Sequence, residues 1–150
     1  MRTLRVASGV FGTAAALFLA FTVSAIAQTQ TFSVTLNGAN EVPPVDTAAT
    51  GTATVTYNPE TMVLTWNVTY TGLSGPALRG EFGGPAAATA NGNTIISLGN
   101  NMTSPINGST TISAPQAAQL LAGQWYIRIR TTDHRTGEIR GQVAAAPPAP

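Results

Sequence analysis

The chain contains no cysteine and no lysine, and only 9% of its 150 residues are charged. The absence of cysteine excludes disulfides, thiolate metal ligands and a lipid anchor on an N-terminal cysteine. An ordinary soluble domain has about 25% charged residues. Because no basic surface is present, nucleic acid is not an expected partner. Threonine, asparagine, glycine and alanine supply the polarity instead, which is typical of an extracytoplasmic β-domain.

The first 27 residues have the three parts of a secretory signal peptide. Arg2 and Arg5 form a basic start, an apolar stretch is densest over residues 14–23, and Ala25 and Ala27 give an A-x-A ending. The alternative is an uncleaved membrane anchor, but glycines and threonines shorten the apolar core below the roughly 20 residues of a membrane span. We therefore expect cleavage after Ala27, secretion or a periplasmic location, and only transient contact with the membrane.

Cleavage would change the charge of the chain. The seven arginines include two in the leader, so five arginines would remain against six acidic residues, a net charge of −1. The remaining sequence predicts one domain over residues 28–144, followed by a Pro/Ala-rich flexible tail over residues 145–150. We expect a monomer.

Alternation of apolar and polar residues with a period of two dominates the domain and predicts strands. The segment at residues 62–72 places Met62, Leu64, Trp66, Val68 and Tyr70 on one face. Its register should be firmly set, because a slip of one residue would expose all five side chains. Strands are expected within residues 31–38, 51–59, 62–72, 78–82, 94–98, 109–112, 125–132 and 138–144.

Only residues 113–123 have a helical pattern. Ser113 and Gln116 have the spacing of a capping box, Pro115 falls in the first turn, and Gly123 ends the segment. About eight short strands with one short helix predict an all-β fold, either an immunoglobulin-like or Greek-key β-sandwich or a barrel.

No catalytic or metal-binding motif stands out. A transition-metal site takes three or four donors, and His134 is the only histidine. A calcium site at Glu41 and Asp46 lacks the regular spacing of a calcium loop, so a polar loop is favoured there. His134 is the only imidazole base in the chain, and its place in a hairpin turn favours an exposed side chain over a catalytic one.

The last hairpin carries most of the charge. Its alternation places Arg128, Arg130, Glu138 and Arg140 on one face, opposite the apolar residues. This face is either a solvated outer surface or a contact surface for an anion or carboxylate. The sequence favours the solvated surface.

Four stretches of the chain resemble the chordin-type (CHRD) domain family: "FSVTLNGANEVPPVDTAATGTA", "LTWNVTYTGLSGPA", "GGPA" and "GQWYIRIRTTDHRTGEIRGQV". Together they run from Phe32 to Val143. The resemblance implies an all-β domain outside the cytoplasm with no established enzymatic activity. It implies eight signature residues: Asn40, Glu41, Pro43, Pro44, Gly137, Glu138, Arg140 and Gly141.

The chain departs from this family at three positions where many members have histidine, which are Glu81, Gly83 and Arg130 here. Those histidines suggest a copper-type site in the relatives, and their loss argues against one in this chain. We hypothesise an ion pair between Glu81 and Arg130 in their place, joined by Arg79 from the same side of its strand.

The sequence therefore predicts a secreted or periplasmic, non-enzymatic binding or structural module with no cofactor. Its partner would be an extracytoplasmic or envelope component. One alternative is a copper-handling domain related to the copper/zinc dismutase sandwich, and another is a hydrolase that uses surface carboxylates. The candidate ion-pair or binding residues are Arg79, Glu81, Arg128, Arg130, Glu138 and Arg140.

Overall fold

The computed structural model describes residues 27–145, so residues 1–26 of the predicted signal peptide and residues 146–150 of the predicted tail lie outside it. Within this range the predicted all-β class, with eight strands and one α-helix, is confirmed. No helix of this range is long and apolar enough to cross a membrane. The elements are β1 (Gln30–Asn37), the 3-10 helix η1 (Gly38–Asn40), β2 (Thr50–Asn58), β3 (Val63–Thr71), β4 (Ala77–Gly84), β5 (Asn93–Ser97), β6 (Ile106–Thr111), α1 (Ala114–Leu121), β7 (Trp125–Thr131) and β8 (Ile139–Val143).

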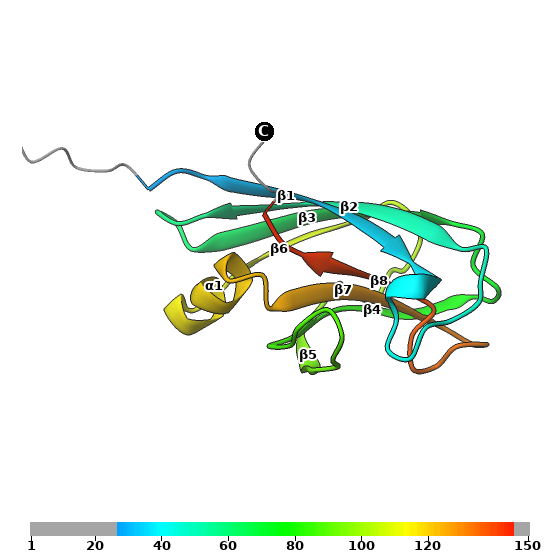
Figure 1. Cartoon of the computed structure of the whole chain (residues 1–150). Coiled ribbons are helices and arrows are strands. Elements are labelled where there is room, and N and C mark those ends of the chain that lie inside the picture. Colours follow the sequence, from blue (N-terminus) through cyan, green and yellow to red (C-terminus); the bar gives the residue numbers. More distant parts are fainter. Residues whose placement is uncertain (1–26, 146–150) are drawn as a thin grey trace, which may run out of the picture.

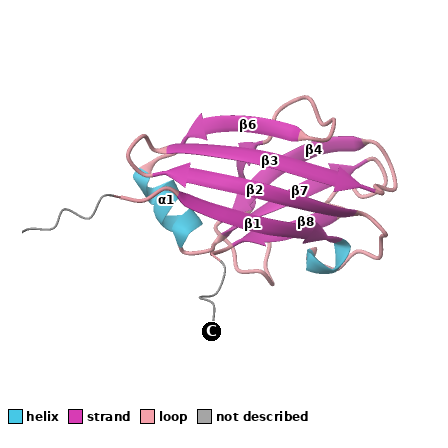
Figure 2. Ribbon diagram, turned by 90° about the horizontal axis from the view of Figure 1, so that it is seen from above, coloured by secondary structure: helices cyan, strands magenta, loops and turns pink. Residues whose placement is uncertain are grey.

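The eight strands form one antiparallel sheet in the order β5-β4-β7-β8-β1-β2-β3-β6. The sheet curls so that β1, β2, β3 and β6 form one layer and β4, β5, β7 and β8 form the other (Figures 1 and 2). The layers are joined at β1 and β8, where Asn37 pairs with Arg140. The first and last strands of the domain therefore lie side by side.

Strict alternation of side chains explains the β1-β2-β3-β6 layer. Leu64, Trp66 and Val68 of β3 are buried, and the threonine and the asparagine between them face outward. Met62 and Tyr70 complete the predicted apolar row as partly buried residues. The strand β6 begins three residues before the predicted segment. Its inward position opposite Trp66 is Gly108, which hides the alternation in the sequence.

Aromatic rings fill the space between the layers. Phe82 of β4 meets Trp66 of β3 edge to face, with ring centroids 5.4 Å apart, and lies 5.9 Å from Trp125 of β7. Edge-to-face contacts of this kind add to the stabilisation from apolar burial. The helix α1 packs at one end of the sandwich through Leu120 (Figure 1). Its predicted capping box is present.

Candidate functional site

The outer face of the β4-β7-β8 layer is covered around Arg128 and Arg140, whereas Arg130 at its edge stays partly exposed. Its outward residues are Glu81 and Gly83 of β4, Tyr126, Arg128 and Arg130 of β7, and Arg140 and Gln142 of β8. Residues 38–44 and 85–92 fold over this face. The side-chain amide of Asn91 donates a hydrogen bond to the carbonyl of Val42 at 2.6 Å, which ties the two covering segments together. We call the face beneath them the arginine face.

The expected ion pair between Glu81 and Arg130 is present at one edge of the arginine face. Arg130 donates twice to Glu81 Oε1, from Nη2 at 2.5 Å and from Nε at 3.1 Å. The other oxygen, Oε2, accepts from Thr94 Oγ1 at 2.8 Å and lies 3.2 Å from Arg79 Nε. The carboxylate is 1% exposed, so these groups take the place of solvent around it.

A second cluster lies beneath the covering segments. Arg128 Nε donates to Glu41 Oε2 at 3.1 Å, and Arg128 Nη2 donates to the side-chain oxygen of Asn91. The same oxygen accepts from Arg140 Nη1 at 3.2 Å. Arg140 Nη2 also donates to the side-chain oxygen of Gln142 at 3.2 Å, and to a backbone carbonyl of the 85–92 segment. Each acceptor of Arg140 is uncharged.

These contacts correct the expectation of a solvated face. Arg128 and Arg140 are only 5% and 1% exposed. Alternation correctly placed both side chains outward from the sandwich, but two connecting segments that are remote in sequence cover them.

The ring of Tyr126 packs against the guanidinium of Arg140. The Arg140 guanidinium lies 3.8 Å from the centroid of the Tyr126 ring, within the range of a cation–π contact. The Tyr126 hydroxyl donates to the carbonyl of Gly92 at 2.9 Å and accepts from its N–H at 3.2 Å. A Cβ at Gly83 would collide with the ring. Tyr126 therefore requires glycine at position 83.

The cluster carries a surplus positive charge. It holds two guanidinium groups and one carboxylate, and Arg128 is the one that lies within salt-bridge distance of Glu41. Burial lowers the pKa of Arg140, and the charge of Arg128 lowers it further, while Tyr126 and Glu41 oppose this shift. Arginine nevertheless stays protonated at neutral pH, because its ordinary pKa lies far above neutral. Within residues 27–145 the charge of Arg140 has no carboxylate partner at contact distance.

Glu41 is the least satisfied member of the cluster. Burial raises the pKa of this carboxyl group, and the charges of Arg128 and Arg140 counteract the rise only in part. Its Oε1 is buried with no hydrogen-bond partner among the described residues. This oxygen lies against Gly137, where a Cβ would collide with it. Glu41 is therefore protonated more readily than an exposed glutamate, which would increase the surplus positive charge.

Glu138 does not belong to the arginine face, and its predicted placement there is wrong. Residue 138 lies just before β8, where the chain still bends, so the alternation of β8 does not extend to it. Its carboxylate accepts hydrogen bonds from Thr47 Oγ1 at 2.7 Å, Thr131 Oγ1 at 2.7 Å, and the N–H and hydroxyl of Ser74 at 2.8 and 3.0 Å. Burial by itself raises the pKa of Glu138, but these hydrogen bonds outweigh it and hold the pKa below its ordinary value.

Two small hollows open beside the arginine face, between the two covering segments. The smaller, of about 90 Å³, is lined by Asn40, Ala88, Arg140 and Gln142. The larger, of about 300 Å³, is lined by Ala39, Asn40, Glu41, Val42, Pro44, Ala88 and Thr89. The two hollows share Asn40 and Ala88. Arg140 therefore faces the smaller hollow, and Glu41 lies in the wall of the larger one.

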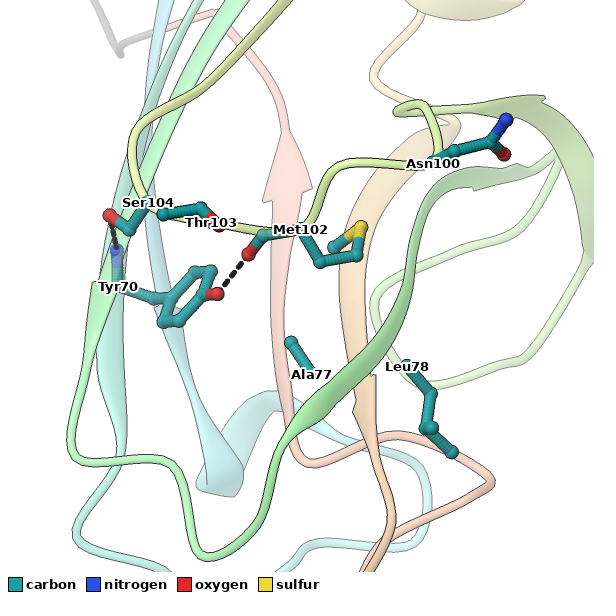
Figure 3. Close-up of a pocket in the computed structure, with 7 residues that line it drawn as sticks. All are labelled: Tyr70, Ala77, Leu78, Asn100, Met102, Thr103 and Ser104. Carbon is teal, nitrogen blue, oxygen red and sulfur yellow. Dashed lines mark hydrogen bonds between the residues drawn. The ribbon is translucent and has the colours of Figure 1, made fainter.

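A larger open groove of about 430 Å³ lies elsewhere, between β3 and β4 (Figure 3). The segment that holds Met102 and Ser104 crosses above it, and Leu78 lies on its other side. The Tyr70 hydroxyl donates to the carbonyl of Met102, and the Tyr70 N–H donates to Ser104 Oγ at 3.1 Å. Its lining includes no charged residue and no base. The groove therefore offers less chemistry than the arginine face.

His134 lies in the turn between β7 and β8, as predicted. Its N–H donates to Thr131 Oγ1 at 3.1 Å, and its carbonyl accepts from Gly137. The contacts of His134 in the turn are therefore made by its backbone. In the part of the chain that the structure describes, no three His, Cys, Asp or Glu side chains are grouped closely enough to hold a metal ion.

Comparison with known proteins gives the family. The model of the CHRD domain matches residues 32–143. The chain belongs to the CHRD domain family. No curated protein and no solved structure matches it significantly.

The residues implied as the CHRD signature lie together in the fold. The N-terminal group contributes Glu41, whose carboxylate packs against Gly137 of the C-terminal group. Arg140 joins β8 to β1 through its pairing with Asn37. A Cβ at Gly141 would collide with the backbone of β1. The signature thus builds the junction of the two layers and the floor of the smaller hollow.

Three functional side chains were not singled out from the sequence: Asn91, Tyr126 and Gln142. Tyr126 and Gln142 follow the same alternation as the arginines, so that pattern could have identified them. Asn91 is followed by Gly92, a pair that is typical of a tight turn. No local signal shows that its side chain binds two arginines on another strand pair.

Proposed function

We propose that this CHRD domain is an exported, non-enzymatic binding module, and that its binding site lies at the two hollows beside Arg140. The observation that carries this proposal is the buried side chain of Arg140, which lines the smaller hollow and whose guanidinium has only uncharged acceptors. A buried ion without an opposite charge costs several kcal/mol. An anionic group on a partner would offset that cost.

The bonding of the three buried carboxylates supports a binding role over catalysis by these groups. Hydrolysis by paired carboxylates needs two acids free to exchange protons across a cleft. Glu81 and Glu138 each accept hydrogen bonds at both oxygens, and Glu41 is paired with Arg128. These groups are fixed in their present contacts, which suits a rigid scaffold.

Export is tested with the full chain carrying a C-terminal tag in a bacterial host. We expect the tagged protein outside the cytoplasm with Gln28 as its first residue, as N-terminal sequencing would show. Replacing Ala25 and Ala27 by leucine should block processing, because signal peptidase requires small residues there. A wild-type protein that keeps its leader and stays in the cytoplasm would contradict export.

Binding is tested by crosslinking the tagged protein in intact cells. Ala88 is exposed and lines both hollows, so Ala88→Leu should fill them without touching the polar cluster. Ala90→Leu makes the same change at an exposed position of the same segment, outside both linings, and serves as the control. We expect a crosslinked component with wild type and with Ala90→Leu that is lost with Ala88→Leu. Equal recovery with all three proteins would refute this site.

The copper-handling alternative has a direct test. Calorimetric titration of residues 28–150 with copper and with zinc should give no stoichiometric binding. Tight binding of one metal ion per chain would replace the proposed function with metal handling.

A further inference from the structure

The two hollows differ in chemistry and share a wall, which indicates a ligand with two unlike parts. We propose that they form a site for the C-terminal carboxylate of a peptide that ends in small apolar residues. This inference rests on the proposed function and gives its ligand a chemical class. The carboxylate would occupy the smaller hollow, and the terminal side chain would lie in the larger one.

The smaller hollow fits a carboxylate in size. Its volume of about 90 Å³ corresponds to roughly three water molecules, since each occupies about 30 Å³ in the liquid. A carboxylate group with one attached carbon has a similar number of heavy atoms. A larger anion with a bulky substituent at the charged centre would not fit.

Some hydrogen-bond donors of Arg140, which lines the smaller hollow, have no acceptor in the protein. A guanidinium group has five N–H donors in a planar fork. Three N–H groups of Arg140 donate to the protein, to Asn91, Ala87 and Gln142. Two more are left for a ligand. These two, the Nε–H and one Nη1–H, lie on different edges of the guanidinium, so a carboxylate would accept from one of them at a time and would supply the missing negative charge. Asn40 also lines this hollow.

The larger hollow suits the apolar end of a peptide. Ala39, Val42, Pro44 and Ala88 provide apolar wall, and the volume of about 300 Å³ accommodates one or two small residues. Glu41 lies in the same wall and would repel a second negative charge on the ligand. The site should therefore prefer a single carboxylate on an apolar body. Capture of a peptide C-terminus through N–H donors is a known recognition mode in other domains.

The test uses residues 28–150 and two acetylated alanine tripeptides, one with a free C-terminal carboxylate and one with a C-terminal amide. Calorimetry should show binding of the free acid at least tenfold tighter than the amide, a difference of about 1.4 kcal/mol. Equal affinity for the two peptides would overturn the proposal, because the amide keeps the apolar part and loses only the charge.

Binding is also measured for two variants of the protein and for acetate. Ala88→Leu should abolish binding of the free acid and Ala90→Leu should leave it unchanged, with circular dichroism showing that both are folded. Acetate should bind at least tenfold more weakly than the tripeptide, because it fills only the smaller hollow. Acetate as tight as the tripeptide would overturn the assignment of a peptide.

The outcome separates this inference from the proposed function. If neither tripeptide binds but crosslinking in cells still depends on Ala88, the peptide assignment is wrong and the binding site stands. If the crosslinked component is also independent of Ala88, both are wrong.

Discussion

Replacing Glu138 by glutamine removes one negative charge from a site built to hold it. The carboxylate of Glu138 accepts four hydrogen bonds, two at each oxygen. The N–H of Ser74 can only donate, so the side chain at position 138 must present an oxygen to it. The amide oxygen of glutamine would have to face Ser74 N and Thr47, and its NH₂ group would then face Thr131.

That NH₂ group creates a conflict at Thr131. The hydroxyl of Thr131 already accepts from the N–H of His134 and donates its own proton to Glu138. Glutamine would oblige it to accept a second time and would leave its proton without an acceptor. Hydrogen bonds to a charged group contribute about 1.5–3 kcal/mol each and neutral ones about 0.5–1.5 kcal/mol. We expect Glu138→Gln to lower the free energy of unfolding by about 2–3 kcal/mol, because the charge assistance is lost and one hydroxyl is left unpaired.

Denaturant unfolding at neutral pH measures this loss, and Glu60→Gln is the control, because Glu60 is exposed and undergoes the same chemical change. The pH dependence provides a second check. The pKa of Glu138 is lower in the folded protein than its ordinary value of 4.5. Its stabilising contribution is therefore fully present above about pH 4.5 and is lost as the pH falls through the folded pKa.

The difference in unfolding free energy between wild type and Glu138→Gln should therefore shrink in acid. A difference below about 0.5 kcal/mol at pH 7, the range of an ordinary surface substitution, would refute the reasoning. A difference that stays constant into acid would show that the charge of Glu138 is not the source of the stability.

Three further sets of substitutions should lower the stability of the folded domain. Gly137→Ala should lower the free energy of unfolding by about 2–3 kcal/mol, since Gly137 has φ 140° and a new Cβ would collide with the Glu41 carboxylate. Denaturant unfolding measures this loss, and an unchanged stability would contradict the close contact between Gly137 and Glu41. Arg130→Met should lower the free energy of unfolding by about 2 kcal/mol and Arg79→Met by under about 0.5 kcal/mol, because Arg130 is 31% exposed and donates twice to Glu81, whereas Arg79 is 50% exposed. Thermal unfolding measures both losses, and equal losses would refute this ranking. Tyr70→Phe should lower the free energy of unfolding by about 1 kcal/mol and speed hydrogen exchange in residues 98–105, because the hydrogen bond from the Tyr70 hydroxyl to the carbonyl of Met102 is lost. Unchanged exchange would show that this hydrogen bond does not hold the segment in place.

The sequence by itself determined the strands and the faces that they bury. Alternation of period two requires no knowledge of the partner strand, so β1, β2, β3 and β7 could be predicted from neighbouring residues alone. The capping box and Gly123 likewise fixed the ends of α1 through local hydrogen bonds. The strand β6 was placed less well, because Gly108 faces the core without an apolar side chain.

The pair of Glu81 and Arg130 could be proposed from the sequence because both residues depart together from the pattern that the CHRD resemblance implies. Opposite charges at two such positions indicate a contact even between strands that are distant in the chain. The structure places them on adjacent strands, 2.5 Å apart at the closest atoms.

Only the tertiary structure decided which charges are covered. Alternation states which side of a strand a residue faces, but not whether another segment lies on that side. Residues 38–44 and 85–92 cover Arg128 and Arg140 through contacts across more than 35 residues of sequence, such as that between Asn91 and Arg128. Alternation also fails at the bend before β8, where the hydroxyl groups around Glu138 come from three separate segments. The sequence determined which residues form the two layers. The folding of the connecting segments decided that Arg140 is a buried charge beside a hollow, because that depends on contacts between residues far apart in the chain.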